Sequence, residues 1–141
     1  MRNRWGRAIA AGVLAELVII GSIMFAIVLI RKLMGPTAES MAMAHTAATW
    51  TELIGGPILV FFVTRWVVRP LSSLQIAHAL VVVSVAVAGQ LSIFSGTVAE
   101  GHAPMWIVAS AVVLKIAGAV AAAVLARRTV GGPPEPLASP S

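Results

Sequence analysis

Apolar residues occupy four long runs of the chain, and polar or helix-breaking residues separate one run from the next. The first run covers about 8–30 and contains a single charged residue, Glu16. About 20 helical residues, rising ~1.5 Å each, cross the ~30 Å hydrocarbon layer of a membrane. Three further runs cover about 44–64, 74–98 and 104–126. The pattern predicts an all-α integral membrane protein, a four-transmembrane-helix antiparallel bundle with short loops.

Glycine and proline mark where these helices end or change. Gly35-Pro36 ends the first helix, because proline lacks an amide donor and disfavours helical geometry in the residue before it. A short polar segment follows, and the Gly55-Gly56-Pro57 sequence inside the second span predicts a kink or a locally opened backbone. The residues 1–130 are expected to form one transmembrane domain. The proline-rich segment 131–141 is expected to be a disordered cytoplasmic tail.

Basic residues near the ends of the spans predict the orientation. Two of them, Arg31 and Lys32, follow the first span, and the others lie at the opposite ends of the helices. The positive-inside rule places the more basic side in the cytoplasm, together with both termini of the chain. We therefore expect a multi-pass protein of the cell membrane. The residues on the more basic side are Arg2, Arg4, Arg7, Arg65, Arg69, Arg127 and Arg128.

Composition excludes several classes of function. Charged residues make up 11% of the chain, well below the ~25% of soluble domains. Cysteine is absent, which excludes disulfides, thiolate metal sites and a cysteine nucleophile. The net charge of +5 comes from basic residues that flank the spans, where they face lipid headgroups, so nucleic acid is not an expected partner. The usual sequence motifs for nucleotide binding, metalloproteases and hydrolases are also missing, and no enzyme activity is expected.

Among the polar residues of the predicted spans, four are candidates for an intramembrane ion pair or polar site, namely Glu16, Glu52, Gln90 and Lys115. Counted from the cytoplasmic arginine of each helix, Glu16 lies about 13 Å deep, Lys115 about 18 Å and Glu52 about 20 Å. A lysine near mid-membrane is too deep to reach either surface and needs an internal partner or a water cavity. By depth Glu52 matches best, with Glu16 within one helical turn. The cluster is either a structural ion pair or a site that couples to protons or substrate.

Small residues predict which helix faces meet, because they let helix backbones approach closely in a membrane. Glu16 shares a face with Ala8 and Gly12 on the first helix, and Lys115 shares a face with small residues on the fourth. On the third helix the expected face carries small residues as well. These faces are Ala8, Gly12 and Glu16; Ala88, Ser92 and Gly96; and Ala111, Lys115, Gly118 and Ala122.

The stretch Leu14-Ala15-Glu16 resembles the first helix of the small multidrug resistance transporters, which are four-helix proteins with a membrane-embedded glutamate used in proton-coupled export. The resemblance implies that Glu16 is the carboxylate for substrate and proton. It covers one helix only. The chain departs from that family in carrying Glu52 and Lys115, and it has no tyrosine, so no family assignment rests on this resemblance.

Methionine and histidine gather in the two loops expected on the outer side. Thioether and imidazole groups suit a soft cation such as Cu(I). A helical segment would present Met41 and His45 on one face and Met43 on another, whereas an extended segment would present all three. Methionine at a membrane surface is more often packing material, so no cofactor is expected. The metal-ligand candidates are Met41, Met43, His45, His102 and Met105.

Two functional hypotheses follow. The first is an accessory, assembly or interaction subunit of the membrane, either a homo-oligomer or part of a larger complex. It is favoured by small-residue helix faces, short loops and the absence of a catalytic set of residues. The second is a small proton- or ion-coupled transporter protomer that uses Glu16, Glu52 and Lys115. A closed ion pair would favour the first, and an open polar cavity the second.

Overall fold

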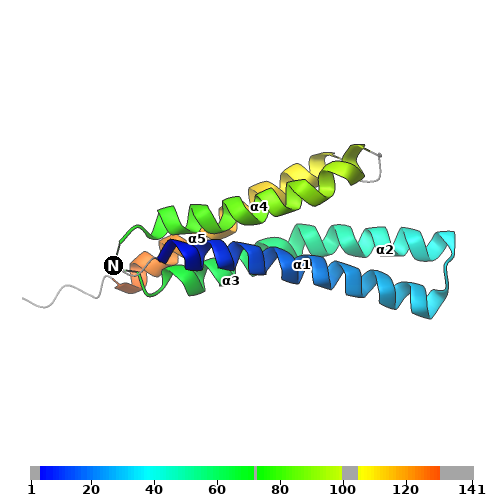
Figure 1. Ribbon diagram of the computed structural model, residues 1–141, viewed down its shortest axis with the longest axis horizontal. Helices are drawn as coiled ribbons and strands as arrows, with labels where there is room; N and C mark the ends of the chain where they lie inside the picture. The colour runs from blue at the N-terminus through cyan, green and yellow to red at the C-terminus, as the bar shows by residue number, and fades with distance from the viewer. Residues whose placement is uncertain (1–3, 72, 100–104, 131–141) are drawn as a thin grey trace, which may run out of the picture.

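The computed structural model describes residues 4–71, 73–99 and 105–130, and the secondary structure within these ranges is helical, without strands (Figure 1). This confirms the all-α prediction for the described part of the chain. Four helical columns are long and apolar enough to cross a membrane, and their number matches the four predicted spans. The elements are α1 (Arg4–Met34), α2 (Ala38–Trp50), the π-helix η1 (Thr51–Gly55), α3 (Gly56–Val68), α4 (Gln75–Ala99) and α5 (Met105–Val130). The segment expected to be a disordered tail lies outside the described residues.

The second column begins earlier than the apolar pattern indicates, at Ala38 rather than near residue 44. A capping box at its start provides the reason. The Thr37 hydroxyl accepts a hydrogen bond from the Ser40 amide, and the Ser40 hydroxyl accepts one from the Thr37 amide, each at 3.1 Å. These bonds satisfy two amide donors at a helix start, so much of the polar segment before the second span is helical.

The Gly55-Gly56-Pro57 sequence opens the backbone without ending the helix. Elements α2, η1 and α3 follow one another without a gap, and the Gly56 amide donates to the Thr51 carbonyl five residues earlier. Proline has no amide to donate, and its ring crowds the carbonyl four residues before it. Pro57 therefore disfavours a regular α-turn across residues 53–57, and the column accommodates it with one wide turn, as π-bulges do within α-helices.

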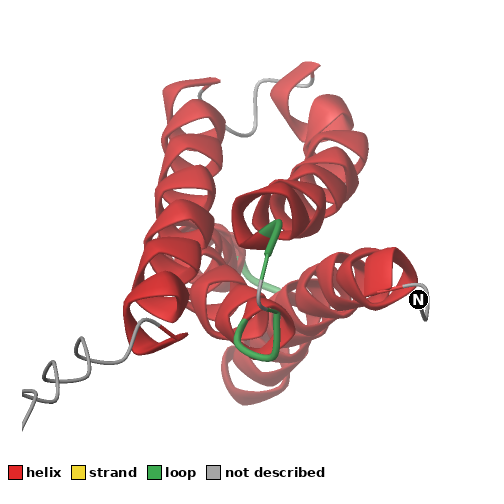
Figure 2. Ribbon diagram, turned by 90° about the vertical axis from the view of Figure 1, so that its left-hand side faces the viewer, coloured by secondary structure: helices red, strands yellow, loops and turns green. Residues whose placement is uncertain are grey.

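The four columns pack together at one end of the molecule and separate toward the other (Figures 1 and 2). The start of α1 and the end of α5 lie at the packed end (Figure 1). Here α1 packs on α3 and α4, while α5 packs on α3 and α4; farther along, α2 packs mainly on α1. We call the packed end the basic end, because its helix ends carry Arg4, Arg7, Arg65, Arg69, Arg127 and Arg128.

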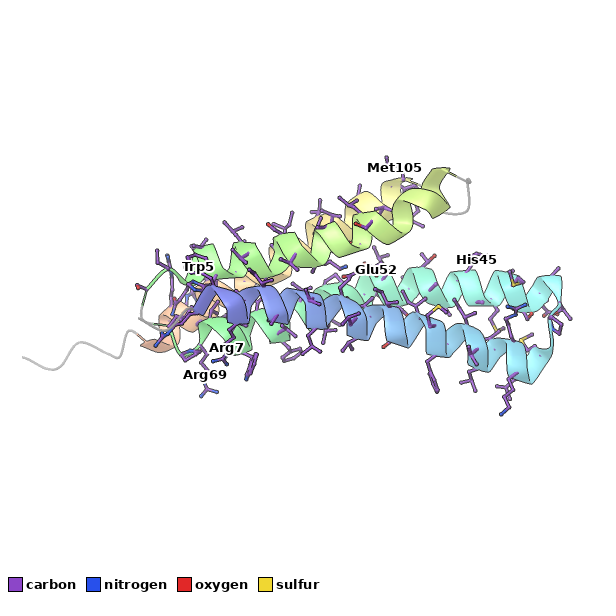
Figure 3. The ribbon with its side chains drawn as sticks, in the orientation of Figure 1. Trp5, Arg7, His45, Glu52, Arg69 and Met105 are labelled. Carbon is purple, nitrogen blue, oxygen red and sulfur yellow. The ribbon has the colours of Figure 1, made fainter. Side chains whose placement is uncertain are left out.

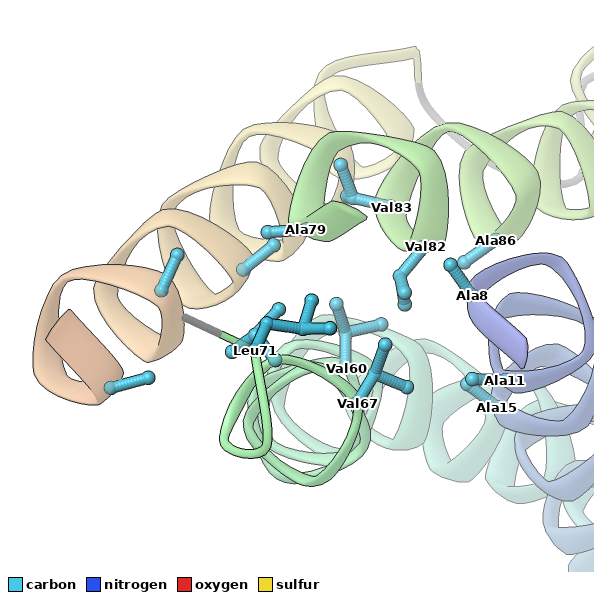
Figure 4. Close-up of a cluster of buried hydrophobic side chains, with 14 residues drawn as sticks. Ala8, Ala11, Ala15, Val60, Val67, Leu71, Ala79, Val82, Val83 and Ala86 are labelled. Atoms are coloured by element: carbon cyan, nitrogen blue, oxygen red, sulfur yellow. The ribbon is translucent and has the colours of Figure 1, made fainter. Parts of the chain in front are cut away.

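The apolar core at the basic end consists almost wholly of alanine and valine (Figure 4). Such short side chains let helices approach closely, and a Cβ atom added at Gly12 would lie 2.6 Å from the carbonyl oxygen of Val82. The buried residues of this core are Ala8, Ala11, Ala15, Val60, Val67, Val68, Leu71, Ala79, Val82, Val83, Ala86, Ala119, Ala123 and Ala126.

Two of the three predicted helix faces are buried, and the third is wrong. Gly12 and Glu16 are buried on α1, and Lys115 is buried on α5. On α4, however, Ala88 and Ser92 are exposed, and the side-chain surroundings of residue 96 lie outside the description. The face of α4 that turns inward carries Ala79, Val82, Val83 and Ala86, because Gly12 of α1 supplies the small residue at this contact and leaves room for valine on α4.

Candidate functional site

The three charged residues within the predicted spans lie together. The ammonium nitrogen Nζ of Lys115 is 2.6 Å from Oε1 of Glu52 and 3.2 Å from Oε2 of Glu16. Residue exposure is 0% for Lys115, 2% for Glu52 and 5% for Glu16. Glu52 lies near the middle of the molecule's length, where the columns begin to separate (Figure 3). We call these three residues the charge cluster. Lysine thus contacts both of its candidate partners rather than one.

Each member of the charge cluster comes from a different column. Glu16 continues the buried face of α1 one turn beyond Gly12, and Lys115 follows Ala111 by one turn on the buried face of α5. Glu52 belongs to the π turn, so the wide turn that precedes Pro57 is also the turn that carries this carboxylate. The cluster therefore connects α1, η1 and α5 at one level.

Two glycines on neighbouring columns make room for the long side chains of the charge cluster. A Cβ atom at Gly56 would lie 2.8 Å from Cε of Lys115, and one at Gly89 would lie 2.8 Å from Cγ of Glu16. A larger residue at either position would displace a charged stem. The role of Gly89 was missed from the sequence, where the only available signal is a glycine beside a polar residue in an otherwise valine- and alanine-rich span.

The charge cluster contains two carboxylates and one ammonium, so with all three ionised it carries an excess of one negative charge. Oε1 of Glu16 and Oε2 of Glu52 are buried, and neither has a hydrogen-bond partner within the described part of the chain. Buried charges are costly unless they are paired and hydrogen-bonded. The arrangement can therefore hold Lys115 firmly, and it also offers unused oxygen acceptors to one further proton or cation.

Gln90 is fully buried on α4, but it does not join the charge cluster. It extends the inward face formed by Val83 and Ala86 by one turn. Among the described residues neither atom of its amide group has a hydrogen-bond partner. Of the four candidate residues, the structure therefore brings three into contact, while the amide of Gln90 is buried without a hydrogen-bond partner among the described residues.

The predicted metal-ligand residues are not brought together. Because the segment is helical, Met41 and His45 lie one turn apart on α2 and Met43 points elsewhere, which is the arrangement that weakens a copper site. Met105 begins α5, in the other arm of the separating columns (Figure 3), and His102 lies outside the described residues. Over residues 4–71, 73–99 and 105–130, no group of three or more histidine, aspartate or glutamate residues is placed to hold a metal ion.

Aromatic and basic side chains organise the basic end. The ring of Trp5 stacks on that of His78 with 4.0 Å between centroids, and Nδ1 of His78 donates to the Leu74 carbonyl at 2.9 Å. The guanidinium of Arg7, on α1, lies 4.0 Å from the centre of the ring of Trp66, on α3. These contacts join the start of α1 to α3 and α4 at the basic end.

Comparisons with known proteins leave the charge cluster as the principal guide to function. The chain has no match among protein-family models, curated proteins or solved structures.

Proposed function

We propose that this chain is an integral protein of the cell membrane with four transmembrane helices and both termini in the cytoplasm, and that it acts as a non-catalytic accessory, assembly or interaction subunit. The four long apolar columns support the membrane placement. The concentration of arginines at the basic end supports the orientation, because basic residues are retained on the cytoplasmic side.

The contact of Lys115 with both carboxylates is the observation that carries this proposal. The charges that a transporter would present to its substrate are here directed at one another, with 2.6 and 3.2 Å between the charged atoms. A closed cluster of this kind connects α1, η1 and α5 and disfavours helix sliding, since any shift would separate buried charges. Such a fixed scaffold suits a subunit that offers its surface to a partner.

The far half of α1 is the surface that this subunit would offer. All the buried residues of α1 lie between Ala8 and Ile19, and from Gly21 to Met34 none is buried by the described part of the chain. Large apolar side chains such as Phe25 and Leu29 are exposed there. Since α2 packs mainly on α1 in this region, a helix from a second copy or from another membrane protein has access to both.

Cysteine-directed photocrosslinking tests the proposal, because the natural chain has no cysteine and single-cysteine variants need no background changes. A thiol-linked photoreactive group at Phe25→Cys should give a discrete protein adduct in native membranes. The matched control is Ile9→Cys, an exposed position on the half of α1 that is packed in the bundle. An adduct at twice the chain mass would identify a homo-oligomer, and another defined mass a different subunit. Labelling of lipid alone at Phe25 would contradict the proposal.

A small proton- or ion-coupled transporter protomer is the second candidate, and the imbalance of the charge cluster favours it. Two carboxylates face one ammonium, and buried oxygen atoms of Glu16 and Glu52 have no hydrogen-bond partner among the described residues. Ionisable groups at this depth commonly mark ion pathways. In proteoliposomes with a trapped pH dye, this candidate requires proton flux that Glu16→Gln abolishes and Glu39→Gln, an exposed control, preserves. Equal flux in empty liposomes would exclude it.

A further inference from the structure

The basic end carries an open groove beside α1 and α3, with a volume of about 570 Å³. Three arginine side chains and three apolar side chains share its lining, and Arg7 and Arg69 extend from the same side of the molecule (Figure 3). The lining residues are Arg7, Phe62, Arg65, Trp66, Arg69 and Pro70. This groove lies apart from the charge cluster.

Contacts with backbone and aromatic groups fix the position of one arginine in the groove. Arg7 donates to the carbonyl of Trp66 at 3.4 Å while its guanidinium lies over the Trp66 ring. The neighbouring Arg4 donates to the carbonyl of Pro70 at 3.3 Å, which ties α1 to the end of α3. A guanidinium held in this way retains free N–H donors for a ligand, because it has five and few are used.

The groove is positively charged and lacks a balancing acid within the described part of the chain. Of the three described acids, Glu16 and Glu52 belong to the charge cluster, and Glu39 lies in the first turn of α2, at the far end of the molecule. None of them lines the groove. The three guanidinium groups of the groove therefore favour an anionic ligand. Arginine is suited to phosphate, because its planar guanidinium can form two parallel hydrogen bonds to phosphate oxygens.

An apolar track leads from the arginines toward the middle of α3. Ile58, Phe62 and Trp66 follow at intervals of one turn, and all three are well exposed. With four membrane-spanning columns, the arginines would lie at the level of the lipid headgroups and this track along the acyl chains. A phospholipid matches this arrangement, because it has a phosphate at one end and hydrocarbon chains at the other.

We propose that this groove is a binding site for an anionic phospholipid, with the headgroup phosphate held by Arg7, Arg65 and Arg69 and an acyl chain lying along Phe62 and Ile58. A free phosphate ion would use the arginines and leave the apolar track without a role. The track and the charge together select a lipid over a soluble anion, and an anionic lipid over a zwitterionic one.

Native mass spectrometry of the full chain in mild detergent tests the site by titration with phosphatidylglycerol. Each interfacial arginine contributes about 1 kcal/mol to anionic lipid binding, so each loss weakens it roughly fivefold. We expect Arg65→Gln with Arg69→Gln to raise the dissociation constant on the order of 25-fold. The matched control, Arg127→Gln with Arg128→Gln, removes two exposed charges from the same end but outside the groove, and it should bind as the natural chain does.

Further titrations with other ligands distinguish an anionic phospholipid from a zwitterionic one and from free phosphate. Phosphatidylcholine with identical acyl chains should bind much more weakly, and inorganic phosphate should not compete. Phe62→Ala should weaken phosphatidylglycerol and leave the folded state intact, because Phe62 is exposed. Equal loss in the Arg127 and Arg128 control, equal affinity for phosphatidylcholine, or full competition by inorganic phosphate would each overturn the proposal. A thermal melt without lipid precedes each titration, and Arg65→Gln or Arg69→Gln alone, each with an expected loss of roughly fivefold, replaces the double variant if that variant fails to fold.

Discussion

Replacing Lys115 with methionine removes the positive charge of the cluster and keeps an unbranched side chain of similar length. The shape matters because the lysine stem passes close to Gly56, where a hypothetical Cβ would lie 2.8 Å from Cε. A branched residue would add a clash to the loss of charge. In Lys115→Met the carboxylates of Glu16 and Glu52 remain buried at the same site without the ammonium between them.

The expected magnitude follows from the number of charges left unpaired. Removing one partner of a buried ion pair costs roughly 3–5 kcal/mol in soluble proteins, and here the removal leaves two carboxylates rather than one. We expect Lys115→Met to lower the free energy of unfolding by at least ~3 kcal/mol. In contrast, Glu16→Gln keeps the shape, leaves a balanced pair between Lys115 and Glu52, and should cost less than ~1 kcal/mol.

Combined substitutions separate charge from packing. Lys115→Met with Glu52→Gln still leaves Glu16 buried without a cation, so it should recover only part of the loss. Adding Glu16→Gln neutralises the cluster and should recover most of it, since replacing all members of a buried ionic group is often nearly neutral. The measurement is equilibrium unfolding of the purified chain in mixed micelles with increasing dodecyl sulfate, followed by circular dichroism.

Ile116→Met serves as the matched control, because it introduces the same residue at an exposed position on the next residue of α5. A loss below ~1 kcal/mol in Lys115→Met, or an equal loss in Glu16→Gln, would refute the reasoning. The first result would mean that the lysine is not an obligatory partner of either acid, and it would raise the transporter candidate above the subunit.

Three further predictions concern packing and topology. A Cβ at Gly12 would lie 2.6 Å from the Val82 carbonyl oxygen, so Gly12→Ala should lower the free energy of unfolding by about 1–3 kcal/mol. The control is Gly21→Ala, where a Cβ has nothing within 4 Å; it should be neutral or slightly stabilising in the same unfolding assay. Reporters fused before Trp5 and after Ser141 should both read cytoplasmic, and an extracytoplasmic signal from either would contradict the four-span topology. Deleting 132–141 should leave the melting temperature in detergent unchanged, because the segment has few apolar residues to bury; a large decrease would show that it docks.

Hydropathy predicted the number and approximate position of the helices because lipid imposes a strict requirement of length and apolarity. The start of the second column was displaced for a local reason: the capping box at Thr37 and Ser40 stabilises a helix that hydropathy alone does not indicate. The inward face of α4 was predicted wrongly because small residues occur on several faces of that helix. Choosing among these faces requires knowledge of the partner helix. Here the partner is α1, whose Gly12 packs against Val82 of α4.

The charge cluster was predictable in its members but not in its contacts. Depth counting assumes ~1.5 Å per residue, an assumption that fails locally in a π turn. Glu52 belongs to such a turn, so its level and direction relative to Glu16 depend on backbone geometry that the sequence signals only through Pro57. For this reason the sequence left the choice between Glu16 and Glu52 open, and in the structure Lys115 contacts both.

The π turn also sets how the charge cluster and the groove at the basic end are placed relative to each other. Downstream of it, α3 presents Phe62 and Trp66 outward and Val60 and Val67 inward. A regular α-helix through residues 51–55 would rotate everything on one side of the turn by about one residue, or ~100°, relative to the other. With Glu52 held against Lys115, that rotation would turn the outward face of α3 away from its present direction and separate Arg65 and Arg69 from Arg7. The same wide turn thus lets one column supply a buried carboxylate to the charge cluster and an arginine-rich outer face to the groove.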